Sequence, residues 1–342
     1  MMGEDFYIGG RLRIFPSDFI VEEVWRDRIC RINYSFLTRI KDHFSARIQD
    51  KKDYLHLTLV KYNWDNIRAL NYIRGKIHVS LKRFGISGTK DKRALTAQRI
   101  SIWRGEAEVM KNLKLPDMIL KDFQYSDRRI NLGDAIGNHF TIAIRDIDKF
   151  NYDHVVHTLH RFKELVTTKG IPNYFGPQRL RGNVEVGKAI KCSNLKQAVE
   201  IIVKKVKPFL EEGDLDKIPK VFWYEKKILQ HLKNFPNDYA GALRKIPKKI
   251  RRFYTHSLQS HTFNQKLQQF ITIDEVPETI TVKGFETPKM PELRTIPITR
   301  RSYFAAKDFQ ILKVSSEVVK IKFTLSKGDY ASTLLSNLTD IK

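Results

Sequence analysis

Ile86-Ser-Gly-Thr-Lys-Asp-Lys-Arg-Ala-Leu-Thr-Ala-Gln98 is the stretch of this sequence that most constrains its fold and chemistry. Glycines near its start allow a flexible turn, and Asp91 follows among the three cations Lys90, Lys92 and Arg93. Cations so close to one carboxylate favour its ionised form and attract phosphate groups. The same pattern is found in charged, solvated turns that precede a strand. The residues of this stretch alone leave both interpretations open.

The composition around this stretch is that of a folded and strongly basic protein. The 342 residues include 62 Lys and Arg against 38 Asp and Glu, which gives a net charge of +24. A chain that is 42% hydrophobic can bury sizeable cores, so disordered and low-complexity architectures are excluded. Positive charge spread along the chain favours a polyanionic partner, and nucleic acid is the commonest one in a cell. At roughly 150 residues per domain, the length predicts about two domains.

Several classes of protein are disfavoured by what the sequence lacks. No apolar run approaches the roughly 20 residues that span a bilayer, and the N-terminus has no secretory pattern, so a cytoplasmic protein is expected. Cys30 and Cys192 form no local redox or metal motif, and the ten histidines have no ligand spacing. The usual nucleotide-binding and hydrolase motifs are also missing. The sequence therefore predicts no metal site, no nucleotide or redox cofactor, and no membrane partner.

Hydrophobic periodicity predicts strands, then helices, then strands again. The expected strands are Phe19–Val24, Tyr54–Val60, Gln98–Trp103, Phe140–Arg145, Thr279–Val282 and Val318–Leu325. The expected helices are Asp65–Arg74, Tyr152–Thr168, a helix capped by Ser193 with helical character continuing to about Phe270, and Tyr330–Leu338. This order is typical of a helical insertion within an α+β domain.

The motif around Asp91 resembles the catalytic motif of the TruD family of pseudouridine synthases, and further segments follow in the order of that family's motifs. Arg13 with Pro16-Ser-Asp-Phe-Ile-Val-Glu22 is similar to its N-terminal motif. Gly137-Asn-His-Phe-Thr-Ile-Ala-Ile-Arg145 is similar to its Gly-Asn-x-Phe strand, and Asn173-Tyr-Phe-Gly-Pro-Gln-Arg179 to a later motif. The resembling segments extend over nearly the whole chain.

This resemblance implies an enzyme that isomerises uridine to pseudouridine in tRNA, at the uridine of position 13. Asp91 is then the nucleophile, and the target base is flipped out of the RNA stack into a pocket. No cofactor is implied, because substrate and product are isomers. The residues implied to contact the substrate are Arg13, Lys90, Asn138, Phe140 and Tyr330. The residues implied to contact the surrounding RNA are Lys92, Arg93 and Arg179.

The resemblance also implies an α+β architecture and a domain division. Residues 1–170 and 298–342 are expected to form a pseudouridine-synthase catalytic domain on a mixed, largely antiparallel sheet, with residues 171–297 as an inserted α+β TRUD domain. The protein is expected to act on tRNA, or on another RNA, as a monomer. Two alternatives on the same fold stay open, a non-catalytic basic RNA-binding protein and an RNA chaperone. Asp91 distinguishes them from the enzyme, because binding alone does not require that carboxylate.

Overall fold

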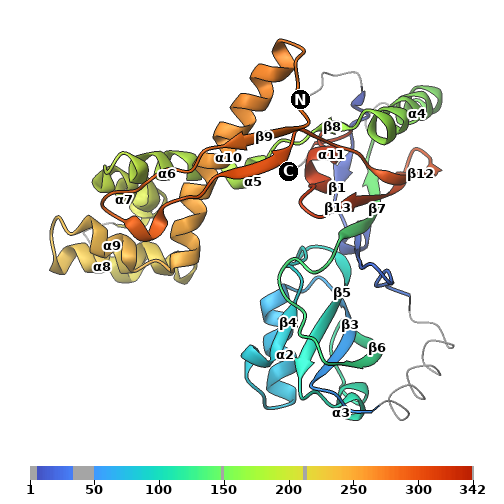
Figure 1. Cartoon of the computed structure of the whole chain (residues 1–342), viewed down its shortest axis with the longest axis horizontal. Helices are drawn as coiled ribbons and strands as arrows, with labels where there is room; N and C mark the ends of the chain where they lie inside the picture. Colours follow the sequence, from blue (N-terminus) through green and yellow to red (C-terminus); the bar gives the residue numbers. More distant parts are fainter. Residues whose placement is uncertain (1–5, 34–49, 148–149, 211–213, 341–342) are drawn as a thin grey trace. The chain divides into compact units, whose positions relative to one another are not determined.

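The computed structural model describes residues 6–33, 50–147, 150–210 and 214–340, and the chain divides into two units (Figure 1). Unit 1 comprises Met1–Ile171 and Phe304–Lys342, and unit 2 comprises Pro172–Tyr303. The short strands β8 (Ile171–Pro172) and β11 (Tyr303–Phe304) pair with each other where the chain leaves unit 1 and returns to it. None of the helices in these described ranges is both long and apolar enough to cross a membrane.

Within the described residues, unit 1 is built on a nine-stranded mixed sheet. Its strands are β1 (Arg11–Leu12), β2 (Phe19–Val24), β3 (Tyr54–Tyr62), β4 (Phe84–Ile86), β5 (Leu95–Trp103), β6 (Met118–Ser126), β7 (Gly137–Arg145), β12 (Lys307–Val314) and β13 (Val318–Ser326). The main path runs β12-β13-β7-β2-β5-β3-β6, with β1 on β7 and β4 on β5. Among the described strand pairs of this sheet, β2 and β5 are parallel and the others antiparallel. This confirms the predicted α+β class and the mixed, largely antiparallel sheet.

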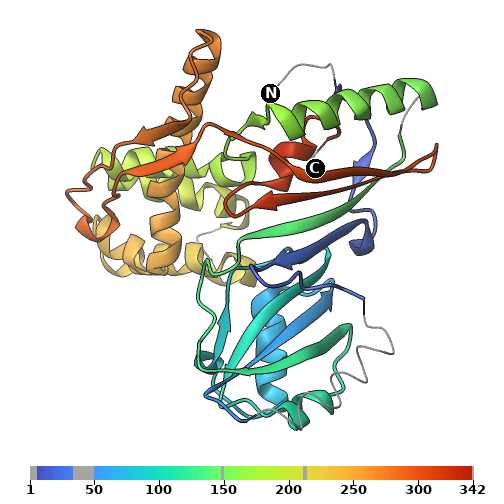
Figure 2. The same cartoon turned by 45° about the vertical axis from the view of Figure 1, so that its right-hand side comes forward.

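One face of this sheet carries two apolar cores, one at each end. At one end, alternate residues of β3 and β5 pack with α2 (Asn66–Lys76) and α3 (Ala107–Lys111). At the other end, alternate residues of β7 and β13 pack with α4 (Tyr152–Thr168) and α11 (Ala331–Leu335). Figure 2 shows α4 along the β12–β13 end and α2 against the β3–β5 end. The cores share a face because cross-strand partners point to the same side of a sheet.

The helix α4 has the bounds that its apolar period predicts. At its N-terminus the side chain of Asn151 accepts a hydrogen bond from the His154 amide at 2.9 Å, which satisfies one of the unpaired amides of the first turn. At its C-terminus Gly170 takes φ +75°, and its amide donates to the Leu165 carbonyl at 2.9 Å. A side chain at Gly170 would lie 2.6 Å from the Phe304 carbonyl oxygen, so glycine is required there.

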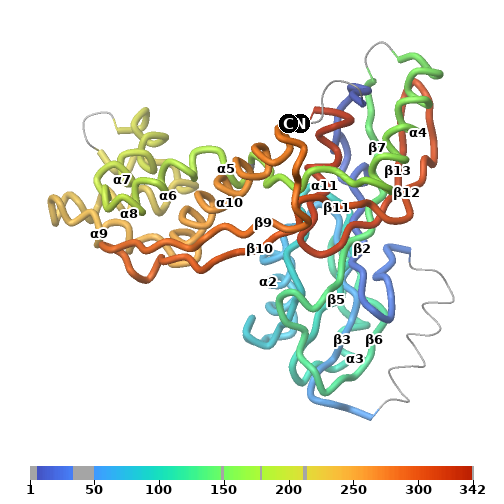
Figure 3. The backbone as a smooth tube through the Cα atoms, turned by 45° about the horizontal axis from the view of Figure 1, so that its top comes forward, coloured from blue at the N-terminus to red at the C-terminus, as the bar shows by residue number. Residues whose placement is uncertain are grey.

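Unit 2 is largely helical, with one two-stranded hairpin beside its longest helix (Figure 3). Its helices are α5 (Pro177–Leu180), α6 (Asn183–Lys191), α7 (Leu195–Val203), α8 (Trp223–Asn234), α9 (Tyr239–Arg244) and α10 (Lys248–Thr272), and its hairpin strands are β9 (Thr279–Val282) and β10 (Ile298–Arg301). Short 3-10 segments of unit 2 occur at Lys204–Phe209, Leu215–Lys217, Lys220–Phe222 and Pro291–Leu293. In unit 1 such segments occur at Pro16–Asp18 and Leu81–Arg83. The helical stretch expected to continue to about Phe270 is therefore several helices.

The predicted cap of α7 is wrong by one residue. Ser193 has φ +59°, in the left-handed region, whereas Asn194 has φ −88°, the negative φ that is usual for an N-cap residue. Asn194 is the cap instead, and its side chain accepts from the Gln197 amide at 3.1 Å. Asn and Ser are both good caps, so the residue types alone did not decide between neighbours.

Candidate active site

The sheet face that the two cores of unit 1 share becomes polar between them. Cross-strand register places Glu23 of β2 beside Asn138 of β7, and Lys61 of β3 beside Thr96 of β5. Gln98 lies two residues beyond Thr96, on the same face of β5. Polar groups at positions that alternation buries cost free energy unless they are bonded. This polar strip of five side chains therefore marks the candidate site.

Asp91 lies at the edge of the polar strip, in the turn between β4 and β5. Its side chain is 52% exposed, and its Oδ2 accepts a hydrogen bond from Arg13 Nη2 at 3.0 Å. The Arg13 guanidinium also lies 4.0 Å from the centre of the Phe19 ring, and its backbone has φ +59°. An ion pair this exposed contributes at most about 1 kcal/mol to stability. Its main effect is to orient the carboxylate, with one face of Asp91 open to solvent.

Lys61 fixes the backbone of the turn that carries Asp91. Its side chain is fully buried, and its ammonium donates to the carbonyl oxygen of Asp91 at 2.9 Å and to that of Trp64 at 2.7 Å. Removal from water lowers the pKa of Lys61 from 10.5 to about 8, although the nearby carboxylates of Asp91 and Asp65 oppose this shift. Lys61 thus adds a positive charge beneath Asp91 and holds the main chain in place.

The depressed pKa of Lys61 gives a pH-dependent contribution to stability. In the unfolded chain this lysine titrates near 10.5, so between about pH 8 and 10.5 the unfolded state binds more protons and the free energy of unfolding rises with pH. Lys61→Met removes this titration. We expect the stability difference, wild type minus variant, to increase across that window in urea unfolding measured at successive pH values. A difference that stays constant with pH would contradict the assignment.

Glu23 and Lys90 form a buried ion pair under the same turn. Lys90 Nζ lies 2.6 Å from Glu23 Oε1, and the two side chains are 8% and 0% exposed. Glu23 also accepts hydrogen bonds from the Ser87 hydroxyl, from the Trp25 indole at 2.9 Å and from the Arg99 amide at 2.9 Å. The charge of Lys90 is therefore neutralised inside the protein, and its contact with substrate stays a prediction.

The polar strip contains buried atoms that have no hydrogen-bond partner within the protein. Among the described residues these include Asn138 Oδ1, Thr96 Oγ1, both amide atoms of Gln98, and Arg13 Nε beside the strip. Most buried polar atoms in proteins are bonded, so a concentration of unbonded ones needs an explanation. A polar ligand or ordered water at the strip would satisfy them. Asn138, predicted to act near the carboxylate, is one of these residues.

Phe140 lies in an aromatic cluster that adjoins the polar strip. Its ring is stacked on Phe323 with centroids 5.3 Å apart and meets the edge of Phe19 at 6.1 Å. Because Arg13 covers Phe19, contacts run continuously from Asp91 to Phe140. Phe140 is only 6% exposed and belongs to the apolar core, so its contact with a substrate base stays a prediction.

The remaining predicted site residues lie outside the polar strip. Lys92 and Arg93 are exposed beside Asp91, and an Arg93 Nη2 atom lies 3.4 Å from the Ile14 carbonyl oxygen. Tyr330 is the N-cap residue of α11, with 38% of its surface exposed. Arg179 belongs to α5 of unit 2. The roles of these four residues stay predictions.

Lys61 and Glu23 are not among the site residues predicted from the sequence, although both carry a recognisable signal. Alternation along β2 and β3 buries Val21 and Leu59, and Glu23 and Lys61 each occupy the next position of the same parity. A charged residue at a strand position that the alternation assigns to the core is therefore a candidate for a buried site residue. Within the described residues, no group of three or more His, Cys, Asp and Glu side chains is arranged to hold a metal ion.

Comparison with known proteins identifies relatives of this chain. The family model of tRNA pseudouridine synthase D (TruD) matches residues 4–276. A Methanosarcina acetivorans protein named Probable tRNA pseudouridine synthase D is 32% identical over 285 residues, which cover 76% of this chain and 59% of that protein. A Methanocaldococcus jannaschii protein named Probable tRNA pseudouridine synthase D 1 is 26% identical, with 99% of this chain and 97% of that protein covered. This chain thus spans less than two thirds of the first relative and nearly all of the second.

A solved structure has the same fold. The crystal structure of a Methanosarcina mazei protein assigned to tRNA pseudouridine synthase D matches with a TM-score of 0.73, covering 98% of this chain and 94% of the other. The two sequences are 23% identical, so this likeness bears on the fold alone. It agrees with the α+β class and the mixed sheet described above.

Proposed function

Because the chain belongs to the TruD family of tRNA pseudouridine synthases, we propose that it isomerises uridine to pseudouridine in tRNA, at the uridine of position 13. The main support for this proposal is the environment of Asp91. This residue is a half-exposed carboxylate, oriented by Arg13, with its own backbone held by a buried lysine. It also borders buried polar atoms that the described residues leave unbonded.

Asp91 is the proposed nucleophile. Its Oδ2 is bonded to Arg13, which leaves Oδ1 to face a ribose. The N1–C1′ bond of the uridine breaks either after attack of the carboxylate on C1′ or after a deprotonation that gives a glycal. The uracil then turns in the site and C5 bonds to C1′. In the first route this bond replaces the bond between C1′ and the carboxylate, which leaves; in the second, C2′ regains the proton whose removal gave the glycal. The C5 hydrogen is then lost to water, and N1 gains a proton. Both routes need an ionised carboxylate.

The target base must leave the RNA stack to reach Asp91. We propose that Asn138 offers its unbonded Oδ1 to a donor of the flipped uracil and that Phe140 packs against the ring after local adjustment. Arg13 keeps the carboxylate oriented, while Lys90 supports the turn from below. Tyr330 is proposed to complete the pocket. Lys92, Arg93 and, in unit 2, Arg179 are proposed to contact RNA phosphates.

Unit 2 is the proposed inserted TRUD domain. The family resemblance gives its limits as residues 171–297, and the compact unit comprises Pro172–Tyr303. Both sets of limits start where β8 leaves unit 1, and they differ by whether β10 is included. The reaction needs one chain, so the proposed active form is a monomer bound to one tRNA.

Release of tritium tests the enzymatic proposal directly. Pseudouridine formation replaces the C5 hydrogen, so tRNA that contains 5-tritiated uridine should release tritium to water when it is incubated with the protein. Mapping of the product should then locate pseudouridine at position 13. If the 342-residue chain releases no tritium from tRNA or from total RNA, the enzymatic proposal fails, and RNA binding without chemistry takes its place.

RNA affinity should fall steeply as the salt concentration rises. The net charge of +24 provides many cations for phosphate groups, and each contact on a single-stranded segment contributes about −0.7 to the slope of log affinity against log salt. Fluorescence anisotropy with labelled tRNA over a series of salt concentrations gives this slope. A flat response would contradict binding through the RNA backbone.

A further inference from the structure

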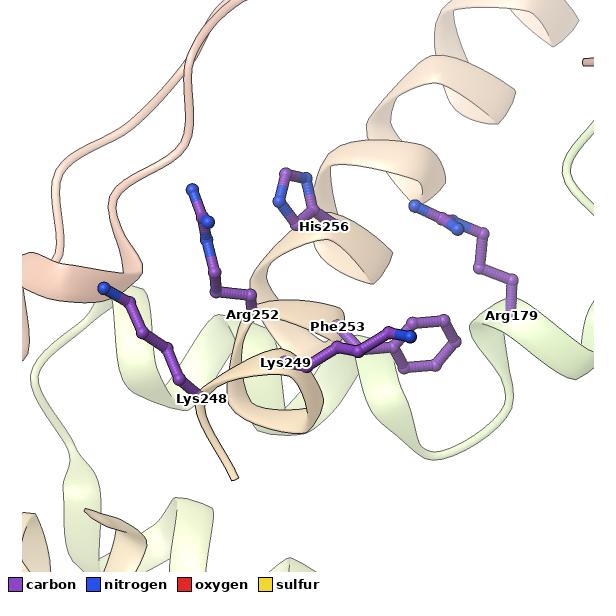
Figure 4. A pocket seen from close by; sticks show the side chains of 6 residues that line it. All are labelled: Arg179, Lys248, Lys249, Arg252, Phe253 and His256. Carbon is purple, nitrogen blue, oxygen red and sulfur yellow. The ribbon is translucent and has the colours of Figure 1, made fainter. Parts of the chain in front are cut away.

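A basic hollow opens on the surface of unit 2. It has a volume of about 480 Å³, within the range of ligand sites, and it is open to solvent. Its lining comprises Arg179, Lys248, Lys249, Arg252, Phe253 and His256. Figure 4 shows Lys248, Arg252 and His256 on successive turns of α10, with Arg179 of α5 across from Phe253. This placement follows from helix geometry, because residues four apart lie on one face.

The cations that line this hollow lack carboxylate partners among the described residues. None of Lys248, Lys249 and Arg252 forms an ion pair with a carboxylate in the described part of the chain. Glu292, in the 3-10 segment Pro291–Leu293, forms ion pairs with Arg244 of α9 and Arg251 of α10, which do not line the hollow. Burial and the cations Arg179 and Arg252 lower the pKa of His256. Burial is the larger cause of this shift, and the two guanidinium groups that add to it also favour a bound anion.

Arg179 is held in place for a ligand. Its guanidinium lies 5.1 Å from the centre of the Phe175 ring and 5.4 Å from that of Phe253. Its Nε donates to the Ser260 hydroxyl at 2.8 Å. No hydrogen bond from its two Nη atoms is found within the described residues, so the fork that binds phosphate oxygens stays available. A side chain fixed in this way loses little conformational entropy on binding.

Phe253 adds a feature that simple anion binding does not need. The residue is 37% exposed, and it lines the hollow together with the cations. Cations along a groove with an exposed aromatic ring are the recurring design of proteins that bind single-stranded nucleic acid, because any base can stack on the ring. An acidic protein surface or a membrane would use the charges but would leave this ring without a matching planar group.

We propose that the basic hollow binds an unpaired segment of the RNA substrate, with phosphates at Arg179, Lys248, Lys249 and Arg252 and a base stacked on Phe253. This rests on the proposed function for the identity of the RNA, but it concerns a site that the chemistry does not use. Unit 2 thereby contributes its own RNA contact, in addition to the residues around Asp91.

A charge-matched pair of variants tests the phosphate contacts. The hollow variant carries Lys248→Gln, Lys249→Gln and Arg252→Gln, and the control carries Lys188→Gln, Lys196→Gln and Lys204→Gln, three exposed lysines elsewhere on unit 2. Both lose three charges. In anisotropy titrations of the 342-residue chain with single-stranded RNA, the hollow variant should bind at least ~10-fold more weakly, with a salt slope smaller by about 2. Equal weakening by both variants would overturn the proposal, because the charge would then act non-specifically.

Phe253→Leu tests the stacked base separately from the charge. Stacking on an aromatic side chain is worth about 1–3 kcal/mol per base, so affinity should fall ~5- to 150-fold with an unchanged salt slope. The same RNA without bases should bind wild type and variant equally. An equal loss of affinity on both RNAs would overturn the stacking. If the wild-type protein releases tritium and these variants bind RNA as tightly as wild type, the proposal that the hollow binds RNA is rejected, while the proposed enzymatic function is retained.

Discussion

Asp91→Asn is expected to abolish pseudouridine formation while RNA affinity stays nearly unchanged. The amide has the size and shape of the carboxylate, so the turn held by Lys61 and Lys90 should keep its structure. It cannot supply the negative oxygen that either route needs. Removal of a catalytic nucleophile costs several orders of magnitude, and a fall of at least ~10³-fold in turnover is expected. Tritium release and anisotropy with the same tRNA measure the two quantities side by side.

Asp127→Asn is the matched control for this variant. Asp127 is also an exposed aspartate of unit 1, 70% exposed and 2.7 Å from the ammonium of Lys52, so its substitution removes a similar surface ion pair. Its turnover should stay at the wild-type level. If Asp91→Asn keeps turnover within about tenfold of wild type, a loss of about 1.4 kcal/mol or less, Asp91 is not the nucleophile. Loss of RNA affinity together with turnover would instead assign Asp91 to binding.

The predictions from periodicity succeeded where a segment is governed by local rules. The helix Tyr152–Thr168 has one broad apolar face and clear caps, and its bounds agree with the structure. The strands β6 and β12 were not predicted. In β12 the residues are mostly exposed or half-buried, because it lies at the edge of the sheet, so its alternation is weak. Pairing with β13 makes it a strand, and pairing is not a local property.

The site shows the same limit. The resemblance of the motifs brought Arg13 and Asp91 to attention, and the structure joins them across 78 residues of sequence. Lys61 and Glu23 belong to the same assembly, but each bonds to residues set by strand register. A strand shifted by one residue would turn both charges to the opposite face of the sheet. The positions of Lys61 and Glu23 in the alternation of their strands indicate that both are buried. The residues to which they bond are seen only in the folded structure.

Glu23→Gln is expected to destabilise the protein by about 3–5 kcal/mol, which is the usual cost of removing one partner of a buried ion pair. Gln can still accept from the Trp25 indole and the Arg99 amide, so most of the hydrogen bonding is kept. The ammonium of Lys90, in a side chain only 8% exposed, would lose its counter-charge. Urea unfolding at neutral pH measures the decrease in the free energy of unfolding. The unfolding transition to follow is that of unit 1, because Glu23 and Lys90 both belong to it.

The neighbouring carboxylate provides a control on the same strand. Glu22 is also buried, but its partner Arg31 is 48% exposed and can be solvated when the charge is removed, so Glu22→Gln should cost no more than about 1 kcal/mol. A second test combines Glu23→Gln with Lys90→Met. Because no buried charge then remains unpaired, the double variant should recover at least half of the stability lost in Glu23→Gln. Two results would contradict this role of the ion pair: an equal loss of stability in Glu23→Gln and Glu22→Gln, or a double variant whose loss of stability equals the sum of the losses in Glu23→Gln and Lys90→Met. In either case the ion pair does not stabilise the turn, and the position of Asp91 must depend on Lys61 instead.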